Sequence, residues 1–170
     1  MRRGYVPGMI TEAAKWVYLL VLAVWVGGMI FFSFVVAPTV FRTLSPEHVG
    51  QLMRRLFPRY YLVGMLCAVL GIVCVAALLA AQAMRMTAAV FSLLLIAGMG
   101  AAQLWMRQAV APQMNGLRQQ VAESKAAHQT LDRKIEEQWQ TLHRLSVQVN
   151  GAVLVCGLAL LFLLVYSRAV

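Results

Sequence analysis

Four long apolar stretches, with the charged residues gathered at their edges, constrain this chain more than any other feature. The centre of the first stretch, residues 17–36, contains no charged side chain. A helix needs about 20 apolar residues to cross the roughly 30 Å hydrocarbon core of a membrane. The sequence therefore predicts four membrane-spanning helices, at about residues 11–37, 58–83, 88–110 and 140–167.

The overall composition leads to the same class of protein. Hydrophobic residues make up 61% of the 170 residues and charged residues 12%. A soluble domain of this size could not bury so much apolar surface. We therefore expect an all-α, integral membrane four-helix bundle that forms a single domain over residues 1–170, with the lipid bilayer as its first partner.

A short interfacial helix is predicted between the first two spans, over residues 45–56. Ser45 followed by Pro46 is typical of a helix start, because serine caps the first turn and proline is tolerated there. The residue before a proline avoids the α conformation. We therefore expect this helix to end before Pro58.

The polar region between the third and fourth spans predicts an extramembrane helical hairpin, over about residues 111–140. Pro112 and Asn115-Gly116 are turn-forming residues and predict a kink or turn near its start. Apolar residues further along follow helical spacing into the fourth span. These are Leu131, Ile135, Leu142, Leu145 and Val149.

The distribution of Lys and Arg predicts the orientation in the membrane. The side with both termini carries five of these residues (Arg2, Arg3, Lys15, Arg85 and Arg168), and the other side carries the remaining ten of the 15. Cytoplasmic loops carry the excess of Lys and Arg, so both termini are expected outside and the long loop in the cytoplasm. Because the basic residues flank spans, the net charge of +9 does not indicate nucleic-acid binding.

Several short motifs resemble those of the transmembrane protein 205-like family, and the resemblance covers nearly the whole chain. They are Trp25-Val26-Gly27-Gly28, Ala37-Pro38-Thr39-Val40-Phe41, Leu56-Phe57-Pro58-Arg59-Tyr60-Tyr61, Arg107 with Pro112, and His143, Ser146 and Asn150. The resemblance implies a small four-helix protein of the bacterial inner membrane, with no defined molecular activity.

A looser resemblance extends to four-helix copper-resistance membrane proteins and to the haem-carrying, membrane-bound protoporphyrinogen oxidase. Those haem proteins place a histidine in the first span, beside a similar Trp-x-Gly-Gly pattern. The first span of this chain contains no histidine. The resemblance therefore does not exclude haem or copper as a cofactor, and it assigns no ligand in the first span.

Polar residues at the loop-rich ends of three spans form the main candidate site. They are Arg59 and Tyr60 in the second span, Gln103 and Arg107 in the third, and His143 and Asn150 in the fourth. Polar groups at this depth are costly unless they face the bundle interior and pair. Such a cluster could bind an anion, a quinone-like headgroup or a metal, or it could consist of hydrogen bonds between helices.

Two weaker patterns point to metals. His128, Asp132, Glu136 and His143 share one helical stripe and could contribute to a divalent-metal site, although such charges also form solvated faces. Cys67 and Cys74, together with ten methionines, offer soft ligands for Cu(I), although these residue types also serve as packing residues.

Small residues at helical spacing predict close helix packing within the bundle. The positions are Gly27-Gly28, Gly64 with Ala68, and Gly98 with Ala102. Several aromatic residues near span ends, including Tyr60, Tyr61 and Trp139, are expected in the membrane-interface belt.

No catalytic motif is present, so three functions stay open. The first is a non-enzymatic structural or partner-binding membrane component that docks other subunits, or a second copy, through residues 106–144. The second is a haem- or metal-binding redox module that uses His143. The third is a subunit of a small-solute or ion transporter, which would need to oligomerise because inverted repeats and broken helices are lacking.

Overall fold

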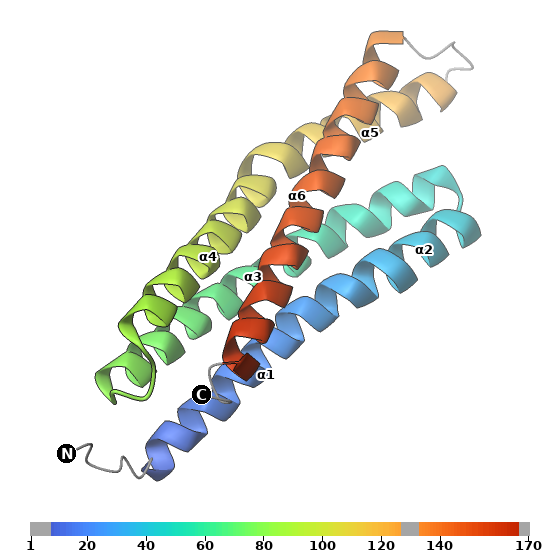
Figure 1. Ribbon diagram of the computed structural model, residues 1–170. Helices are drawn as coiled ribbons and strands as arrows, with labels where there is room; N and C mark the ends of the chain where they lie inside the picture. The colour runs from blue at the N-terminus through green and yellow to red at the C-terminus, as the bar shows by residue number, and fades with distance from the viewer. Residues whose placement is uncertain (1–7, 127–132, 167–170) are drawn as a thin grey trace, which may run out of the picture.

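The computed structural model describes residues 8–126 and 133–166, and within these the chain forms four long helices (Figure 1). The first consists of α1 (Met9–Phe31), the π-helical segment η1 (Phe32–Val36) and α2 (Ala37–Thr43). The second is α3 (Pro46–Ala80). The third consists of α4 (Met86–Trp105), the π-helical segment η2 (Met106–Val110) and α5 (Ala111–Ala126), and the fourth is α6 (Arg133–Tyr166). All four are long and apolar enough to cross a membrane, which confirms the predicted all-α class.

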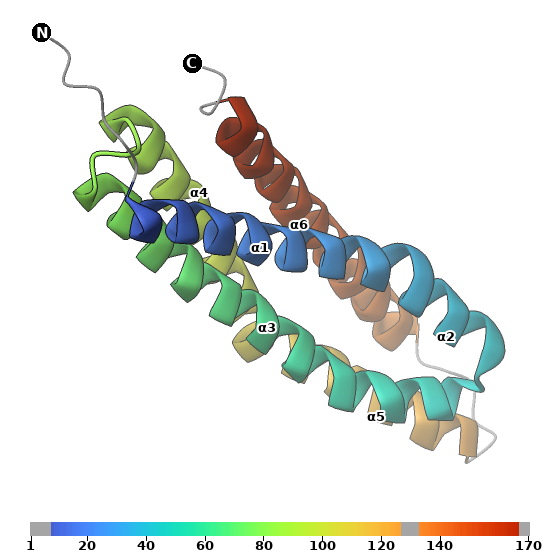
Figure 2. The same ribbon diagram turned by 90° about the horizontal axis from the view of Figure 1, so that it is seen from below.

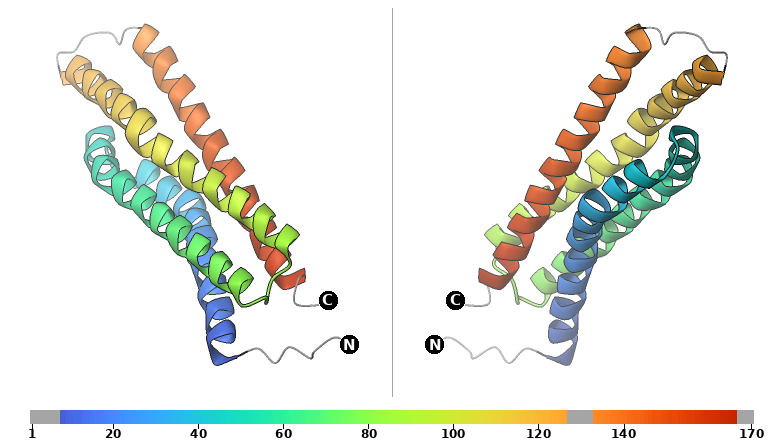
Figure 3. Two further views of the ribbon diagram at one scale, coloured as in Figure 1. Left: turned by 90° about the vertical axis from the view of Figure 1, so that its left-hand side faces the viewer. Right: turned by 90° about the vertical axis from the view of Figure 1, so that its right-hand side faces the viewer.

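The helices form a ring in which each touches two neighbours. α1 packs against α3, α3 against α4, α4 against α6, and α6 against α1. We call the end of the bundle that holds the turn between α2 and α3 the loop end. The opposite end holds the turn between α3 and α4. The tips of α5 and α6 extend farther at the loop end than the turn between α2 and α3 does (Figure 3). Figure 2 shows α5 lying beside the first half of α3.

The core of the ring is apolar, and so is much of its outer surface. Tyr18, Leu22, Trp25 and Met29 follow helical spacing along α1 and are buried. On the outside, Phe162 is 68% exposed and other large apolar side chains are comparably open. Contiguous exposed apolar surface of this kind is costly in water and favourable in lipid. The outer surface therefore fits a membrane environment.

Glycine brings the helices close together at a few positions inside the ring. A Cβ atom on Gly157 of α6 would lie 2.6 Å from Val26 Cγ2 of α1. One on Gly64 of α3 would lie 3.1 Å from Gln103 Cδ of α4, which agrees with the packing predicted there. The same prediction was wrong for Gly27, Gly28 and Gly98. A Cβ atom on any of these would meet nothing within 4 Å, because they face outwards.

The helix through Pro58 corrects the predicted interfacial helix over residues 45–56. α3 runs without a break from Pro46 to Ala80, with Pro58 inside it. Proline removes one backbone hydrogen bond and crowds the preceding turn. Beside this turn, the Arg55 carbonyl accepts a hydrogen bond of 2.7 Å from Arg59 Nη1, which adds a side-chain bond next to the disturbed position.

Two π-helical segments precede prolines and replace the expected kink or turn at Pro112 and Asn115-Gly116. η1 ends two residues before Pro38, and η2 ends two residues before Pro112. Each proline is the last residue of the same tripeptide, Val-Ala-Pro, at residues 36–38 in one helix and 110–112 in the other. A π turn lets the helix continue where the α-helical bond to the proline nitrogen is missing. The Val-Ala-Pro sequence thus occurs at corresponding places in the first and third helices.

Candidate functional site

A polar contact joins α3 and α6, which lie opposite each other in the ring. The Tyr60 hydroxyl donates a hydrogen bond of 3.3 Å to Asn150 Oδ1. Asn150 Nδ2 in turn donates a bond of 3.0 Å to the Ser146 carbonyl, one turn earlier in α6. The Tyr60 hydroxyl also interacts with the side chain of Gln103 in α4. Three of the six predicted site residues therefore meet inside the loop-end half of the bundle.

Trp25 of α1 completes this group and was not among the predicted site residues. Gln103 is 2% exposed and Trp25 3%. Gln103 Oε1 and Trp25 Nε1 are both buried without a hydrogen-bond partner. Both side chains border Gly64, because a Cβ atom there would lie 3.1 Å from Gln103 Cδ and 3.2 Å from Trp25 Nε1. An unpaired donor thus lies close to an unpaired acceptor, each contributed by a different helix.

We call Trp25, Tyr60, Gln103 and Asn150 the core polar cluster. One side chain from each of the four helices contributes to it. An indole N–H, a phenol and two amides can hydrogen-bond, but they offer no imidazole, thiolate or carboxylate. The cluster therefore suits neutral hydrogen bonding rather than metal binding or proton transfer near pH 7. A tryptophan in the middle of an apolar span was the available sequence signal, since a buried indole N–H usually finds a partner.

The other three predicted residues, Arg59, Arg107 and His143, do not join this cluster. All three are exposed. Arg59 bonds to its own helix backbone, and Arg107 Nη1 lies 3.9 Å from Met65 Sδ at the outer surface. The His143 ring stacks on Trp139, with 6.4 Å between centroids. The predicted six-residue cluster is therefore corrected to Tyr60, Gln103 and Asn150.

Helical phase explains why these side chains point outwards. The buried positions of the third helix run through Met99, Gln103, Met106 and Val110, so Arg107 falls beside this row. In α6, Gly157 is buried whereas His143, two heptads earlier, is exposed. An ideal α-helix drifts by about 20° per heptad, so positions seven apart do not stay on one face indefinitely. Desolvating an arginine would add a further cost.

The predicted metal patterns do not assemble within the described residues. His128 and Asp132 lie outside them, while Glu136 and His143 are exposed on α6. Among the described positions, no group of three or more His, Cys, Asp and Glu side chains could hold a metal ion. Cys67 and Cys74 are buried in the apolar core along α3.

An aromatic cluster lies at the loop end, next to the core polar cluster. Tyr61 ring centroids lie 5.8 Å from Phe57 and 5.4 Å from Tyr60, and Tyr60 lies 4.7 Å from Phe32 of η1. Tyr61 is 2% exposed, so the prediction that it belongs to the membrane-interface belt was wrong. The Arg118 guanidinium of α5 closes this cluster, 5.6 Å from the Phe57 ring centroid. The Leu-Phe-Pro-x-Tyr-Tyr block thus supplies most of an internal aromatic wall.

Replacing Tyr60 by phenylalanine is expected to lower the free energy of unfolding by about 0.6 kcal/mol, the typical value of a hydrogen bond between membrane helices. The ring contacts with Phe32 and Tyr61 would remain, while the hydroxyl would lose its bond to Asn150 and its interaction with Gln103. Reversible unfolding in mixed micelles would measure the change. Tyr166→Phe is the control, since Tyr166 is exposed; an equal loss in both variants would contradict a role for the bond.

A comparison with protein families matches residues 20–123 to a domain of unknown function, DUF4149. The chain belongs to this family. The matched region runs from α1 to α5 and contains Trp25, Tyr60, Gln103 and Arg118, whereas Asn150 of α6 lies beyond it. No functionally characterised protein and no solved structure is detectably similar.

Proposed function

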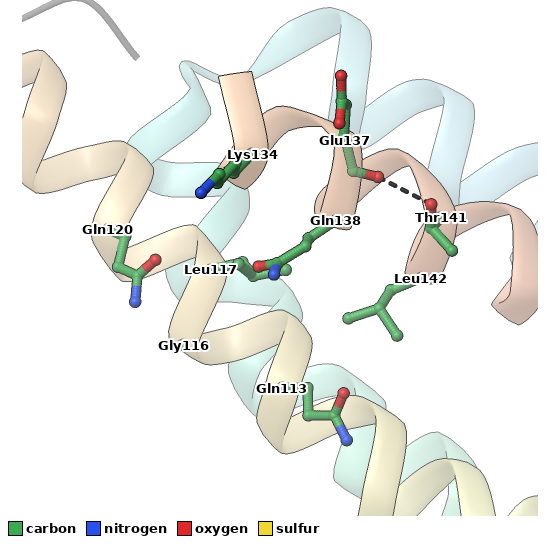
Figure 4. Close-up of a pocket in the computed structure, with 9 residues that line it drawn as sticks. All are labelled: Gln113, Gly116, Leu117, Gln120, Lys134, Glu137, Gln138, Thr141 and Leu142. Carbon is green, nitrogen blue, oxygen red and sulfur yellow. Dashed lines mark hydrogen bonds between the residues drawn. The ribbon is translucent and has the colours of Figure 1, made fainter. Parts of the chain in front are cut away.

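We propose that the chain is a non-catalytic membrane component that binds a helical segment of a partner membrane protein through α5 and α6. The observation that carries this proposal is a groove of about 640 Å³ between the two helices (Figure 4). The predicted location of this helix pair outside the apolar spans supports it, as does the resemblance to the transmembrane protein 205-like family, whose members have no defined activity. From the sequence, we expect the protein in the bacterial inner membrane, with both termini outside and the long loop in the cytoplasm.

The groove has an apolar floor and polar rims. Leu117 of α5 and Leu142 of α6 form the apolar part, and the amides of Gln113, Gln120 and Gln138 stand around it. Figure 4 shows Leu117 on α5 and Gln138 on α6, the two helices that border the groove. Small-molecule pockets are lined mainly by apolar and aromatic groups. A narrow apolar strip between amides instead suits an amphipathic helix, which is a common occupant of grooves between helices.

The charges of the groove also favour a peptide segment. Lys134 and Glu137 stand at the α6 side, so the lining carries one charge of each sign. The Thr141 hydroxyl is occupied by a bond of 2.8 Å to the Glu137 carbonyl. With one carboxylate and no imidazole or thiol in the lining, the groove offers recognition rather than paired acid-base chemistry. Glu137 pairs with Arg133 at 2.9 Å, so the amides and leucines of the lining are the groups that a partner helix would contact.

Filling the groove at Gly116 is expected to weaken partner binding by at least about tenfold. Gly116 lines the groove, and a Cβ atom there would meet nothing within 4 Å, so Gly116→Phe blocks the groove without strain in the fold. Gly151→Phe is the matched control, because Gly151 of α6 is equally open and lies outside the groove.

The partner would first be identified by photo-crosslinking in the membrane. A photoreactive residue at Gln120 or Gln138 should give one discrete product, and the same residue at the exposed, outward Phe162 should not. The identified partner, purified, should then bind the wild type and the Gly151→Phe protein but not the Gly116→Phe protein. Equal binding to both variants would overturn the proposal, and so would a crosslinked product that is a second copy of the chain.

A further inference from the structure

Arg118 of α5 is a half-buried cation held between two aromatic rings. Its guanidinium carbon lies 5.6 Å from the Phe57 ring centroid of α3 and 5.1 Å from the Trp139 ring centroid of α6. Cation–π contacts of this kind orient a guanidinium and lower its cost of burial. A ring that attracts the cation accepts no conventional hydrogen bond, so these contacts do not use the N–H donors of the guanidinium as an anion would. Three helices therefore hold Arg118 in one place at the loop end.

The charge of Arg118 is not neutralised by the described part of the protein. The ion pairs found there join Lys15 to Glu12 and Arg133 to Glu137. The one hydrogen bond of the Arg118 side chain is a long contact of 3.4 Å from Nη1 to Asn115 Oδ1, although a guanidinium carries five N–H donors. A partly buried charge without a counter-charge is costly. An anion would offset this cost.

A second arginine lies nearby and strengthens the argument. Arg54 of α3 is exposed and lies three residues before Phe57, on the same side of the helix as the ring that contacts Arg118. Repulsion between the Arg54 and Arg118 charges agrees with this placement. Packing α5 against α3 brings them together. Two cations from different helices, converging without an intervening carboxylate in the described residues, form an arrangement that a phosphate-type anion would stabilise.

A small cleft adjoins Arg118 and has polar as well as aromatic residues in its lining. It is lined by Asn115, Arg118 and Ser146 together with the aromatic rings of Phe57 and Tyr61. Its volume of about 10 Å³ is enough for a single water-sized group. One oxygen of a tetrahedral anion could enter the cleft, while its other oxygens would stay outside it.

The positions of Arg54 and Arg118 along their helices indicate that the anion belongs to a lipid headgroup. Arg54 precedes the expected start of its span, at residue 58, by four residues, and Arg118 follows the expected end of its span, at residue 110, by eight. These offsets are about one and two helical turns, which places the pair near the headgroup layer of a bilayer. Anionic lipids attract basic residues at that surface.

We propose that Arg118 and Arg54 bind the phosphate of an anionic phospholipid headgroup at the loop end, between α3 and α5. Arg118, positioned by the rings of Phe57 and Trp139, binds the phosphate from the protein side, and Arg54 binds it from the lipid side. The site is separate from the groove between α5 and α6, which Arg118 does not line. Lipid binding would anchor the first turns of α5 at the membrane surface.

Native mass spectrometry of the detergent-purified chain would test this, with phosphatidylglycerol and phosphatidylcholine titrated separately. We expect the wild type to retain one phosphatidylglycerol per chain and to bind it at least about tenfold more tightly than phosphatidylcholine, as charge-assisted hydrogen bonds imply. Arg118→Gln and Arg54→Gln should each remove most of this preference. Arg42→Gln, which removes an exposed charge of α2, should keep it.

Three outcomes would overturn the proposal. The first is an equal affinity of the wild type and Arg118→Gln for phosphatidylglycerol, and the second is the absence of any preference over phosphatidylcholine. The third is competition by millimolar inorganic phosphate at constant ionic strength, which would make the site one for soluble phosphate. If Arg118→Gln does not fold, the phosphatidylglycerol preference of Arg54→Gln is compared with that of Arg42→Gln, because both residues are exposed. An equal preference in these two variants would then overturn the proposal.

Discussion

Replacing Gly157 by leucine is expected to lower the free energy of unfolding by about 3 kcal/mol, near the upper range for overpacked cores, or to prevent folding altogether. Gly157 lies in α6 where this helix crosses α1. A Cβ atom there would lie 2.6 Å from Val26 Cγ2 and 3.4 Å from Met99 Cε. Val26 is β-branched and stiff in a helix, so it cannot rotate away. The two helices would have to separate to admit the larger side chain.

The matched control is Gly98→Leu in α4. Gly98 is exposed on a helix of the same bundle, and a Cβ atom there would meet nothing within 4 Å. This change should leave stability almost unchanged, with a small gain from the better helix propensity of leucine. Unfolding of both variants in mixed micelles, followed by circular dichroism, would give the comparison. Equal stability of the two variants would show that α1 and α6 do not approach closely at Gly157.

The fold was predictable because bilayer thickness sets the length of a spanning helix. Four apolar stretches of sufficient length could only become four helices. The ends of the helices were harder to predict, since local signals at Pro58 and Pro112 compete with continuous packing. At Pro58 a side-chain bond from Arg59 is added beside the disturbed turn, and at Pro112 the π-helical segment η2 accommodates the proline. Local rules for proline describe the cost of such a turn but not the neighbours that offset it.

The candidate site was only half predictable, for a reason that lies in helix phase. Tyr60, Gln103 and Asn150 were correctly placed together because polar residues at that depth turn inwards. Arg107 and His143 were misplaced because spacing of four or seven residues fixes a face only to within several tens of degrees. Whether such a side chain faces the interior of the bundle depends on how the helix is rotated against its neighbours. The sequence of one helix alone does not determine that rotation.

The two π-helical segments flank the sites at the loop end. Phe32 of η1 touches Phe57 and Tyr60, and Met106 and Val110 of η2 pack with Tyr61. Segments of π-helix inside α-helices are frequent at functional sites. Their common Val-Ala-Pro sequence places equivalent backbone distortions on the first and third helices, on either side of the Leu-Phe-Pro-x-Tyr-Tyr block. Both π-helical segments therefore contribute side chains to the packing of this block.

Replacing Trp25 by alanine is expected to lower the free energy of unfolding by about 3 kcal/mol, because lipid cannot fill the cavity left inside the bundle. Gly64→Ala alone should cost about 1 kcal/mol, since its Cβ atom would lie 3.1 Å from Gln103 Cδ and 3.2 Å from Trp25 Nε1. In the Trp25→Ala protein the same methyl group no longer meets the indole and still meets Gln103, so the double variant should be more stable than the sum predicts by about 0.5 kcal/mol. Gly98→Ala, made in both backgrounds, should add without coupling, because Gly98 faces open space. Strict additivity of Trp25→Ala with Gly64→Ala would show that Trp25 and Gly64 are not in contact, and would remove Trp25 from the core polar cluster.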